Sequence, residues 1–262
     1  MNLINLKNLS FEYLQNGSNN FQLENLSLAI NHRDFISILG PNGSGKSTLV
    51  KIIANIIKPQ HGKRTLHNKN YSEIARREFA KEIAFVPQNM SVNFPYSVYE
   101  IVMMGRSPHL NFFGMEKSRD HELVTSTLKQ LEIFHLKDKG INEVSGGEAQ
   151  RALIARAFVQ KPKILLLDEP NAHLDVKHQL SIFKLLFKMN NEEGLTIVNI
   201  SHDLNLAQQF SSRIILMKEG KILFDDKPSI VLNEYNIKTV FDVNSKIFPN
   251  QAGNNSFISV VP

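Results

Sequence analysis

Residues 40–48, Gly-Pro-Asn-Gly-Ser-Gly-Lys-Ser-Thr, restrict the fold of this chain more than any other segment. Glycines at these positions let backbone N–H groups turn inward around an anion. The compact segment 35–39, apolar except for Ser37, predicts a buried strand before the turn, and a helix is expected from about Lys46 to Ile57, with Pro59 just beyond it. That helix points its positive end at the same anion. The pattern G-x-x-x-x-G-K-[ST] in this context therefore predicts a phosphate-binding loop in an α/β fold.

The expected phosphate cradle consists of Gly40, Pro41, Asn42, Gly43, Ser44, Gly45, Lys46, Ser47 and Thr48. The Lys46 ammonium can reach the β- and γ-phosphates of a nucleotide, and the Ser47 hydroxyl can ligate Mg²⁺. The alternative is an ordinary glycine turn beside a solvated lysine. The expected strand before the segment and the expected helix after it favour the phosphate loop.

Two carboxylates end a second apolar run. The run 164–167 predicts a buried strand, and Asp168 and Glu169 follow it directly. In an open α/β sheet, ligands bind at the carboxyl ends of the strands. Asp168 is suited to hold Mg²⁺ through water, and Glu169 is suited to orient and deprotonate an attacking water. An acidic pair at a strand end is more often a turn or a helix cap, but a phosphate loop upstream favours the catalytic interpretation.

Alternating strand and helix patterns predict the remaining architecture. Further elements are expected as follows: antiparallel strands before residue 31 with a turn at 16–20, a helix at 71–81, a strand at 83–86, mostly helix from 98 to about 158 with breaks near 107–108 and 139–140, a helix at 176–189, a strand at 195–200, a helix at 204–210, and a hairpin of 213–217 with 221–224. The expected fold is a P-loop NTPase core, α/β with a mainly parallel sheet, N-terminal antiparallel strands and an inserted helical subdomain. The sequence after Pro228 yields no secure assignment.

Composition restricts the environment and the partners. The chain of 262 residues has no cysteine, which excludes disulfides and thiolate metal sites and suits a reducing cytoplasm. Its net charge of +5 is compatible with nucleotides, nucleic acid or an anionic membrane surface, but the charges are scattered and do not by themselves favour nucleic acid. No signal-peptide pattern begins the sequence, and no apolar run approaches the roughly 20 residues that span a bilayer. A role at a membrane would need a partner there.

The segment 144–151, Val-Ser-Gly-Gly-Glu-Ala-Gln-Arg, resembles the signature motif of ABC ATPases, and it precedes Asp168 by the interval usual in that family. Ser145, Gly146 and Gly147 open a helix that runs on from Glu148, which makes a second anion site at a helix N-terminus without a lysine of its own. An isolated Ser-Gly-Gly would more often be a helix cap. The order of the motifs along the chain favours the family.

Four single residues resemble further landmarks of the ABC ATPases. By this resemblance Tyr13 stacks on adenine, with ordinary strand packing as the alternative, and Gln88 is the Q-loop glutamine that senses Mg²⁺ and links to the permease. The segment 171–175 resembles the D-loop, in which Asp175 is retained while His173 replaces the commonest small residue. His202 resembles the switch histidine that contacts the γ-phosphate.

The resemblance covers about residues 1–228 and implies an ABC ATPase domain there, with a helical subdomain at about 92–158 and a short C-terminal extension, 229–262, packed on the core. It implies an ATP hydrolase that works as a homodimer. Each ATP would lie between the phosphate loop of one subunit and the signature motif of the other. The residue roles that it implies are catalysis by Lys46, Glu169 and His202, Mg²⁺ binding by Ser47, Gln88 and Asp168, and nucleotide contacts from Glu148 and Asp175. It also implies integral membrane permease subunits as partners, and a peripheral location on the cytoplasmic face of the inner membrane.

The segment 96–109 indicates a type of transporter. It resembles the E-x-V-x-x-G-R-x-P-H pattern of ATPases that serve importers of ferric siderophores, haem, cobalamin and, in a related type, molybdate. Such import would involve a periplasmic or surface substrate-binding protein indirectly. The alternative is an amphipathic first helix of the subdomain with a solvated Arg106. The substrate itself is not predicted, because by resemblance it contacts the permease.

Two other ABC functions stay open. One is the ATPase of an exporter, which the segment 96–109 disfavours. The other is a non-transport ATPase that acts on nucleic acid or ribosomes, which the lack of long heptads and of an internal repeat disfavours, so no nucleic-acid partner is expected. A purely structural role is disfavoured because the expected catalytic residues are intact.

Overall fold

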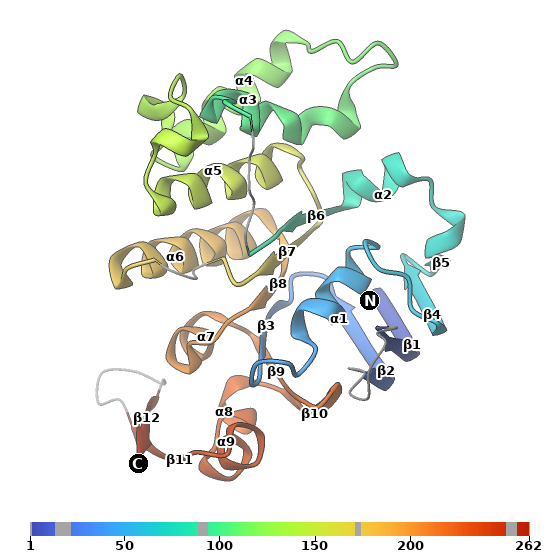
Figure 1. Cartoon of the computed structure of the whole chain (residues 1–262), viewed down its shortest axis with the longest axis vertical. Helices are drawn as coiled ribbons and strands as arrows, with labels where there is room; N and C mark the ends of the chain where they lie inside the picture. Colours follow the sequence, from blue (N-terminus) through green and yellow to red (C-terminus); the bar gives the residue numbers. More distant parts are fainter. Residues whose placement is uncertain (1, 14–21, 89–93, 171–173, 250–255, 262) are drawn as a thin grey trace. The chain divides into compact units, whose positions relative to one another are not determined.

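The computed structural model describes every residue except 1, 14–21, 89–93, 171–173, 250–255 and 262. The chain divides into two compact units, one formed by residues 1–73 and 183–262 and the other by residues 74–182. The boundary between them falls within the helix α6 (Val176–Glu193), which Figure 1 labels.

The first unit contains a four-stranded antiparallel sheet in the order β2-β1-β4-β5. Its strands are β1 (Asn2–Glu12), β2 (Gln22–Asn31), β4 (His61–Leu66) and β5 (Lys69–Asn70). The antiparallel pairing of β1 with β2 confirms the prediction from alternation, while the turn expected at 16–20 lies outside the described residues. Neither β4 nor β5 was predicted. The β4 segment, His-Gly-Lys-Arg-Thr-Leu, has no alternating apolar face, and β5 consists of two polar residues. In the structure the first three residues of β4 are exposed.

A second set of strands in this unit has the order β10-β9-β3-β8. They are β3 (Phe35–Leu39), β8 (Thr196–Ile200), β9 (Arg213–Lys218) and β10 (Lys221–Asp226). β3 pairs in parallel with both β8 and β9, and β10 returns antiparallel to β9 as the predicted hairpin. Every residue of β3 and β8 is buried, including the polar Ser37, Thr196 and Asn199, so apolar residues occur on both faces of these strands instead of alternating with exposed ones.

Predicted helix boundaries differ at three places, one of which is α6, expected at 176–189 but continuing to Glu193. The helix after the phosphate loop, α1, spans Lys46–Ile53 and ends before Ile57, because Asn55 adopts the left-handed region at φ 58° and closes the helix upstream of Pro59. The single helix expected at 71–81 is wrong. The structure has a 3₁₀ turn, η1 (Tyr71–Glu73), and a separate helix, α2 (Arg76–Glu82), divided at Ala75, whose backbone is not helical.

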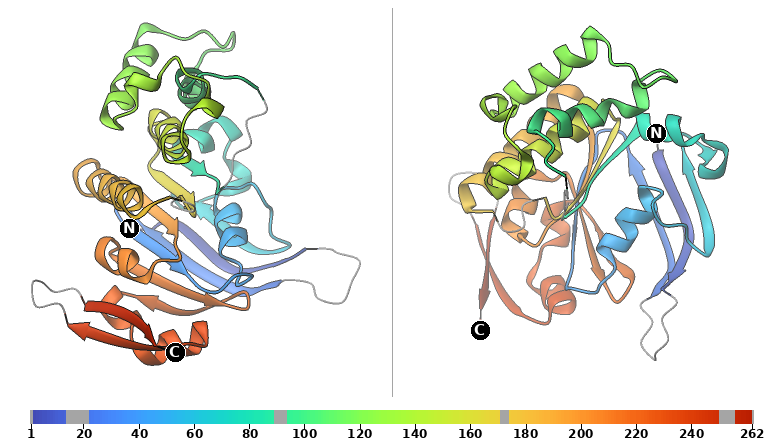
Figure 2. Two further views of the ribbon diagram at one scale, coloured as in Figure 1. Left: turned by 60° about the vertical axis from the view of Figure 1, so that its left-hand side comes forward. Right: turned by 45° about the horizontal axis from the view of Figure 1, so that its top comes forward.

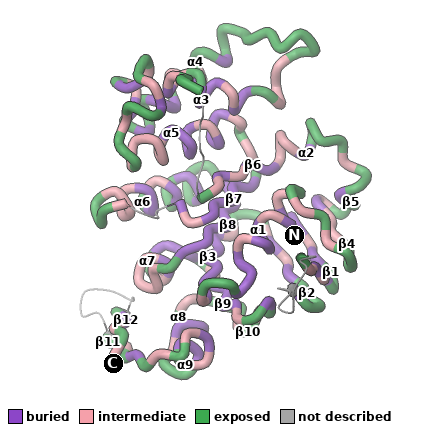
Figure 3. Tube along the Cα trace, in the orientation of Figure 1, coloured by how far each residue is buried: buried purple, intermediate pink, exposed green. Residues whose placement is uncertain are grey.

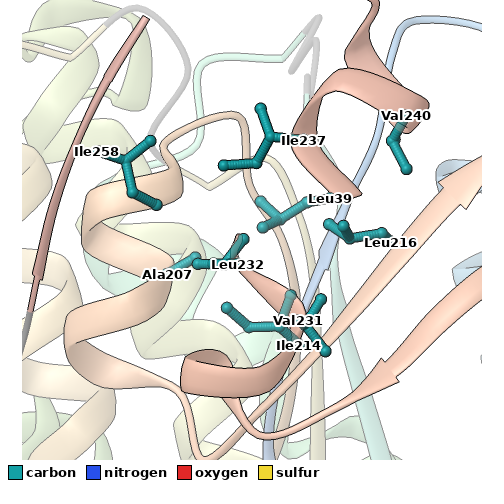
Figure 4. Close-up of a cluster of buried hydrophobic side chains, with 9 residues drawn as sticks. All are labelled: Leu39, Ala207, Ile214, Leu216, Val231, Leu232, Ile237, Val240 and Ile258. Atoms are coloured by element: carbon teal, nitrogen blue, oxygen red, sulfur yellow. The ribbon is translucent and has the colours of Figure 1, made fainter. Parts of the chain in front are cut away.

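The C-terminal elements of the first unit share an apolar cluster with its strands (Figure 4). They are α7 (Leu204–Phe210), α8 (Pro228–Val231), α9 (Glu234–Phe241), β11 (Asn244–Pro249) and β12 (Ser256–Val261). The cluster joins Leu39 of β3 and Leu216 of β9 to Ile237 and Ile258. The hairpin β11–β12 packs against α9 and α7, as both views of Figure 2 show in red and orange.

The second unit contains the parallel pair β6 (Ile83–Val86) and β7 (Ile164–Asp168) and a group of helices. The helical elements are α3 (Val98–Met103), η2 (Met104–His109), α4 (Ser118–Gln130), η3 (Phe134–Leu136), η4 (Ile141–Glu143) and α5 (Gly146–Val159). α3, α4 and α5 pack on one another. The predicted helical character of 98–158 and the predicted break at Lys139-Gly140 are confirmed, but Ser107 and Pro108 lie inside η2, and the first break comes at 110–117.

Burial follows this arrangement in each unit, with the central strands buried and the connecting loops exposed (Figure 3). Among the described residues, none of the helices is both long and apolar enough to cross a membrane.

Candidate functional site: a nucleotide site

The phosphate loop joins β3 to α1 in the first unit. A side chain on Gly40 would overlap the backbone carbonyl of Met217, so the loop approaches β9 as closely as glycine allows. Lys46 is only 5% exposed, and its Nζ donates to the carbonyl oxygens of Gly40 and Pro41, each at 2.9 Å. The ammonium is therefore held across the mouth of the loop, where a phosphate would meet it.

The rest of the cradle suits an anion. The Ser44 hydroxyl is buried and has no hydrogen-bond partner among the described residues. The Gly220 N–H donates to the Ser44 carbonyl at 3.1 Å, which ties the loop to the β9–β10 turn. No acidic residue lies in the first turn of α1, so nothing there opposes the positive end of the helix. A bound phosphate would satisfy the buried hydroxyl.

Tyr13 and His202 belong to the same unit as the phosphate loop. The Tyr13 hydroxyl lies 3.5 Å from Oγ1 of Thr48, and its ring packs edge-on against Phe11 with the centroids 4.7 Å apart. His202 follows β8, and the Ser201 N–H donates to the Ile38 carbonyl, so β3 and β8 end at the same edge. The structure thus places both residues on elements that border the loop, and the Tyr13 ring also has the strand packing that was its alternative.

The turn after β8 contains a residue that sequence analysis missed. Asp203 caps α7, accepting through Oδ1 from the N–H groups of Asn205 and Leu206 at 2.8 and 2.9 Å. The Ser201 hydroxyl accepts from the Asp203 N–H at 3.1 Å. These bonds fix the backbone on both sides of His202. An aspartate directly before an apolar-periodic segment is a helix N-cap signal, and it would have identified this residue.

In the second unit, the expected general base contacts the expected Q-loop residue. Gln88, two residues beyond β6, donates from Nε2 to Oε2 of Glu169 at 2.6 Å. Glu169 has φ 51°, an unusual value for a residue with a side chain, and it follows directly on Asp168, which is 4% exposed at the end of β7. The parallel pair β6–β7 therefore delivers an amide and two carboxylates to one edge, as predicted for strand ends.

The signature segment forms the N-terminus of α5. Ser145 is the N-cap, and its hydroxyl and N–H both donate to Oε2 of Glu148, at 2.7 and 2.8 Å. These bonds lower the pKa of the Glu148 carboxyl. A side chain on Gly146 would meet nothing within 4 Å, whereas one on Gly147 would press on His178. The segment thus presents an open backbone face on the Gly146 side.

Asp175 caps the start of α6. Its Oδ1 accepts from the backbone N–H of His178 at 2.8 Å and lies 2.8 Å from the Nδ1 of the same histidine. The backbone hydrogen bond, followed by the side-chain one, lowers the pKa of the Asp175 carboxyl. The preceding positions of the expected D-loop, 171–173, lie outside the described residues.

The residues expected to hold Mg²⁺ have suitable donor chemistry. Ser47, Gln88 and Asp168 offer a hydroxyl, an amide oxygen and a carboxylate, and hard oxygen donors of this kind suit Mg²⁺, which keeps several waters. Within the described part of the chain, no group of three or more histidine, aspartate or glutamate side chains is placed to hold a metal ion. Ser47 belongs to the first unit and Gln88 and Asp168 to the second, so metal binding by these three residues together remains a prediction.

The segment 96–109 has a structural role within the second unit. Arg106 is buried and donates from Nε to Oδ1 of Asp120 at 2.7 Å and from Nη1 to the Val159 carbonyl. A side chain on Gly105 would overlap the Arg156 carbonyl, and His109 bonds the Gln160 carbonyl through Nε2 at 2.8 Å. Arg106 is thus a buried ion-pair partner and not solvated, and the segment fastens η2 to the end of α5.

A buried phosphate loop between a parallel strand and a helix, with acidic residues ending another strand, defines the class as P-loop nucleotide-binding proteins. Comparison with known proteins then specifies the family. The ABC transporter family model matches residues 23–172. The chain belongs to the ATP-binding subunits of ABC transporters, and its enzymatic activity is ATP hydrolysis.

Individual relatives are similar over most of their length. The petrobactin import ATP-binding protein FpuC of Bacillus anthracis is 35% identical, with 88% of this chain and 85% of that protein covered. The ferric enterobactin transport ATP-binding protein FepC of Escherichia coli is 36% identical, covering 86% and 83%. Among solved structures, an inward-facing metal-chelate type ABC transporter matches with a TM-score of 0.87 at 29% identity, covering 100% of this chain and 98% of that one. The dimeric ABC transporter cassette MJ0796 matches at 34% identity with a TM-score of 0.75, covering 86% and 98%.

Proposed function

We propose that this chain powers the import of a metal chelate, of the iron-siderophore type, through a membrane permease. The observation that carries the proposal is the similarity over the full chain to a metal-chelate type transporter, together with the import functions that the names of FpuC and FepC state. The chain would lie peripherally on the cytoplasmic face of the cell membrane, bound to the permease subunits.

In the first unit, the phosphate loop binds the nucleotide. Lys46 moves its ammonium from the Gly40 and Pro41 carbonyls to the β- and γ-phosphates, and the buried Ser44 hydroxyl gains an acceptor. Tyr13 offers its exposed ring to adenine, and His202 offers its imidazole to the γ-phosphate. When bound through Ser47, Gln88 and Asp168, Mg²⁺ would neutralise charge on the phosphate oxygens.

In the second unit, Glu169 orients and deprotonates the attacking water. Gln88 holds that carboxylate in place through its 2.6 Å hydrogen bond to Oε2. We further propose that Ser145, Gly146 and Gly147 of one copy complete the nucleotide site of a second copy. The Ser145 hydroxyl would exchange Glu148 for a γ-phosphate oxygen, and the open face at Gly146 would admit that phosphate.

Affinity capture tests the transport proposal. The tagged full-length chain is recovered from detergent-solubilised membranes of its source cells, and the co-purifying subunits are reconstituted into vesicles. We expect one polytopic permease, and ATP hydrolysis that rises with a metal-loaded chelate and its binding protein but not with the metal-free chelate. Recovery of ribosomes or DNA-repair proteins without a permease would overturn the transport role, and solute movement away from the ATP side would assign an exporter.

A further inference from the structure

An exposed loop of the second unit carries three large apolar side chains. This aromatic loop, residues 110–116, leads from η2 into α4, and Figure 3 shows the segment before α4 as exposed. Phe112 is 96% exposed, Phe113 81% and Met115 62%. The two phenyl rings pack edge to face with their centroids 5.7 Å apart. Apolar side chains gathered in this way on a surface mark an interaction site.

Hydrogen bonds hold the aromatic loop in a defined turn. The Asn111 Oδ1 accepts from the backbone N–H groups of Phe113 and Met115, at 3.1 and 2.9 Å. The Arg77 guanidinium bonds the Leu110 carbonyl at the start of the loop. The apolar side chains are therefore presented by a backbone that is closed on itself and anchored at its first residue.

A basic cavity adjoins the aromatic loop at both of its ends. The cavity has a volume of about 680 Å³, and His109 and Lys117, the residues on either side of the loop, both line it. Its charged lining consists of the cations Arg106, Lys117, Arg119 and Lys161 and the carboxylates Asp120 and Glu122.

The charges of the basic cavity do not cancel. Arg106 and Asp120 neutralise each other in their buried pair at 2.7 Å. Lys117, Arg119 and Lys161 are exposed, and none of the three has an ion-pair partner among the described residues. Among the lining residues, Glu122 is the one remaining carboxylate, and the nearby Glu116 pairs with His121 at 3.3 Å, so the lining keeps an excess of positive charge. Clustered cations of this kind attract phosphate groups.

We propose that the aromatic loop and the basic cavity together bind an anionic phospholipid at a membrane surface. The two phenylalanines and Met115 enter the interface between headgroups and acyl chains, while Lys117, Arg119 and Lys161 hold headgroup phosphate. A soluble phosphate would use the cations alone and leave the apolar loop without a role, whereas a lipid uses both. Stable surface binding needs two such signals acting together. The inference does not depend on the transport proposal, because it requires no permease.

Vesicle sedimentation tests the cations. Full-length protein is mixed with vesicles of phosphatidylcholine alone or with phosphatidylglycerol added. We expect binding only to the anionic vesicles, weakening in high salt, and a loss of about fivefold for each cation removed. The variants are Lys117→Gln, Arg119→Gln and Lys161→Asn, since Lys161 has φ 53°, which asparagine tolerates. Matched controls are Lys63→Gln, Lys227→Gln and Lys238→Gln, which remove exposed lysines of the other unit and should retain nearly all binding.

Fluorescence tests the aromatic loop. The chain has no tryptophan, so Phe112→Trp provides a single indole reporter. We expect its emission to shift to the blue with anionic vesicles and to be quenched when the vesicles contain brominated lipid. The double variant Phe112→Ser/Phe113→Ser should lose most binding, while Tyr235→Ser, which removes an exposed aromatic ring of the other unit, should not. A chain that sediments with vesicles while its indole remains unshifted would overturn the proposal.

A titration with a soluble anion distinguishes a lipid headgroup from a free phosphate as the ligand of the basic cavity. Inorganic pyrophosphate is titrated calorimetrically into a Lys46→Ala background, so that the phosphate loop does not contribute. Binding of pyrophosphate that requires the three cations, without any binding to anionic vesicles, would assign the basic cavity to a soluble anion and overturn the lipid proposal. Equal binding to neutral and anionic vesicles would also overturn it, because the cations would then have no role.

Discussion

At the residue scale, the phosphate loop depends on one buried lysine. The Lys46 ammonium is almost inaccessible to water and donates to the carbonyl oxygens of Gly40 and Pro41, an arrangement that holds a positive charge ready at the loop. An ammonium that is already desolvated interacts strongly with a phosphate, because the surrounding water screens it little.

Replacing this lysine should weaken nucleotide binding itself. We expect Lys46→Ala to lower ATP affinity roughly tenfold or more, since it removes a charge-assisted bond to phosphate. Lys51→Ala, a change on the same helix, serves as the control and should bind ATP as the wild type does. Isothermal titration calorimetry measures both. Unchanged affinity in Lys46→Ala would remove the assigned role.

Glu169 is the residue on which hydrolysis should depend. We expect Glu169→Gln to retain ATP binding and to lower hydrolysis by about 100-fold or more, because a glutamine cannot accept the proton of water. The exposed Glu193→Gln is the matched control, and its hydrolysis should equal that of the wild type. Phosphate release reports the rate. Because activity without a permease can be low, the comparison is made with the reconstituted complex.

At the scale of the element, η2 packs closely on α5. This packing explains residues of the segment 96–109, which the sequence analysis interpreted as the mark of one type of transporter. Gly105 lets the two backbones approach, and Arg106 then bonds the last turn of α5. A pattern that resembles a functional signature can therefore reflect a packing requirement of the helical unit.

A single methyl group at this contact should destabilise the protein. We expect Gly105→Ala to lower the free energy of unfolding by about 2 kcal/mol, because the added carbon overlaps a backbone carbonyl that has little room to move. Gly146→Ala, whose added carbon would meet nothing within 4 Å, is the stability control. Urea unfolding followed by circular dichroism compares the two, and equal midpoints would contradict the packing argument.

The Arg106–Asp120 pair should make stability depend on acid. Burial alone raises the pKa of the Asp120 carboxyl, but hydrogen bonds from the Lys117 N–H and from the Arg106 guanidinium outweigh burial and leave the pKa below its usual value. Because the folded-state pKa is depressed, this contribution is complete above the unfolded pKa of about 4 and is lost as the pH falls through the folded one. Urea midpoints measured across acid pH should fall more steeply for the wild type than for Asp120→Asn. Parallel slopes would contradict this.

How far the sequence predicts these elements depends on their patterning. Ile164–Leu167 is an unbroken apolar run and Phe35–Leu39 is interrupted only by the small Ser37, and both are strands as predicted. His61–Leu66 is a strand only because it pairs with β1, a long-range contact that leaves no local signal. The loop at 110–117 was missed for a related reason: its apolar residues suggest a helix, but Asn111 and Gly114 close it into a turn.

At the scale of the whole molecule, the expected site residues fall on two units. Tyr13, the phosphate loop and His202 belong to the first, and Gln88, Asp168, Glu169 and the signature segment belong to the second. Within each unit, the sequence predicted that the site residues following parallel strands lie at one edge of the sheet, because parallel strands end at the same edge. It did not predict the pairing of Gln88 with Glu169, which depends on side-chain geometry, or the cap at Asp203.

The tail after Pro228 shows a further limit of sequence reasoning. Its short helices and its hairpin are weakly patterned, yet Val231, Ile237 and Ile258 join the apolar cluster of β3 and β9. These residues are buried by contacts with the rest of the first unit, so a short stretch of sequence read by itself could not predict their burial. The domain limits expected from the resemblance remain a prediction.

The most direct test of the account is the mass of the Glu169→Gln chain in ATP and Mg²⁺, measured by size-exclusion chromatography with light scattering. Because one copy is proposed to complete the site of another, we predict about twice the 29.8 kDa of a single chain with ATP, and a single chain with ADP. Adding Ser145→Arg, which fills the proposed contact with the second nucleotide, should return the protein to one chain in ATP. A Glu169→Gln chain that binds ATP and remains monomeric would contradict the account.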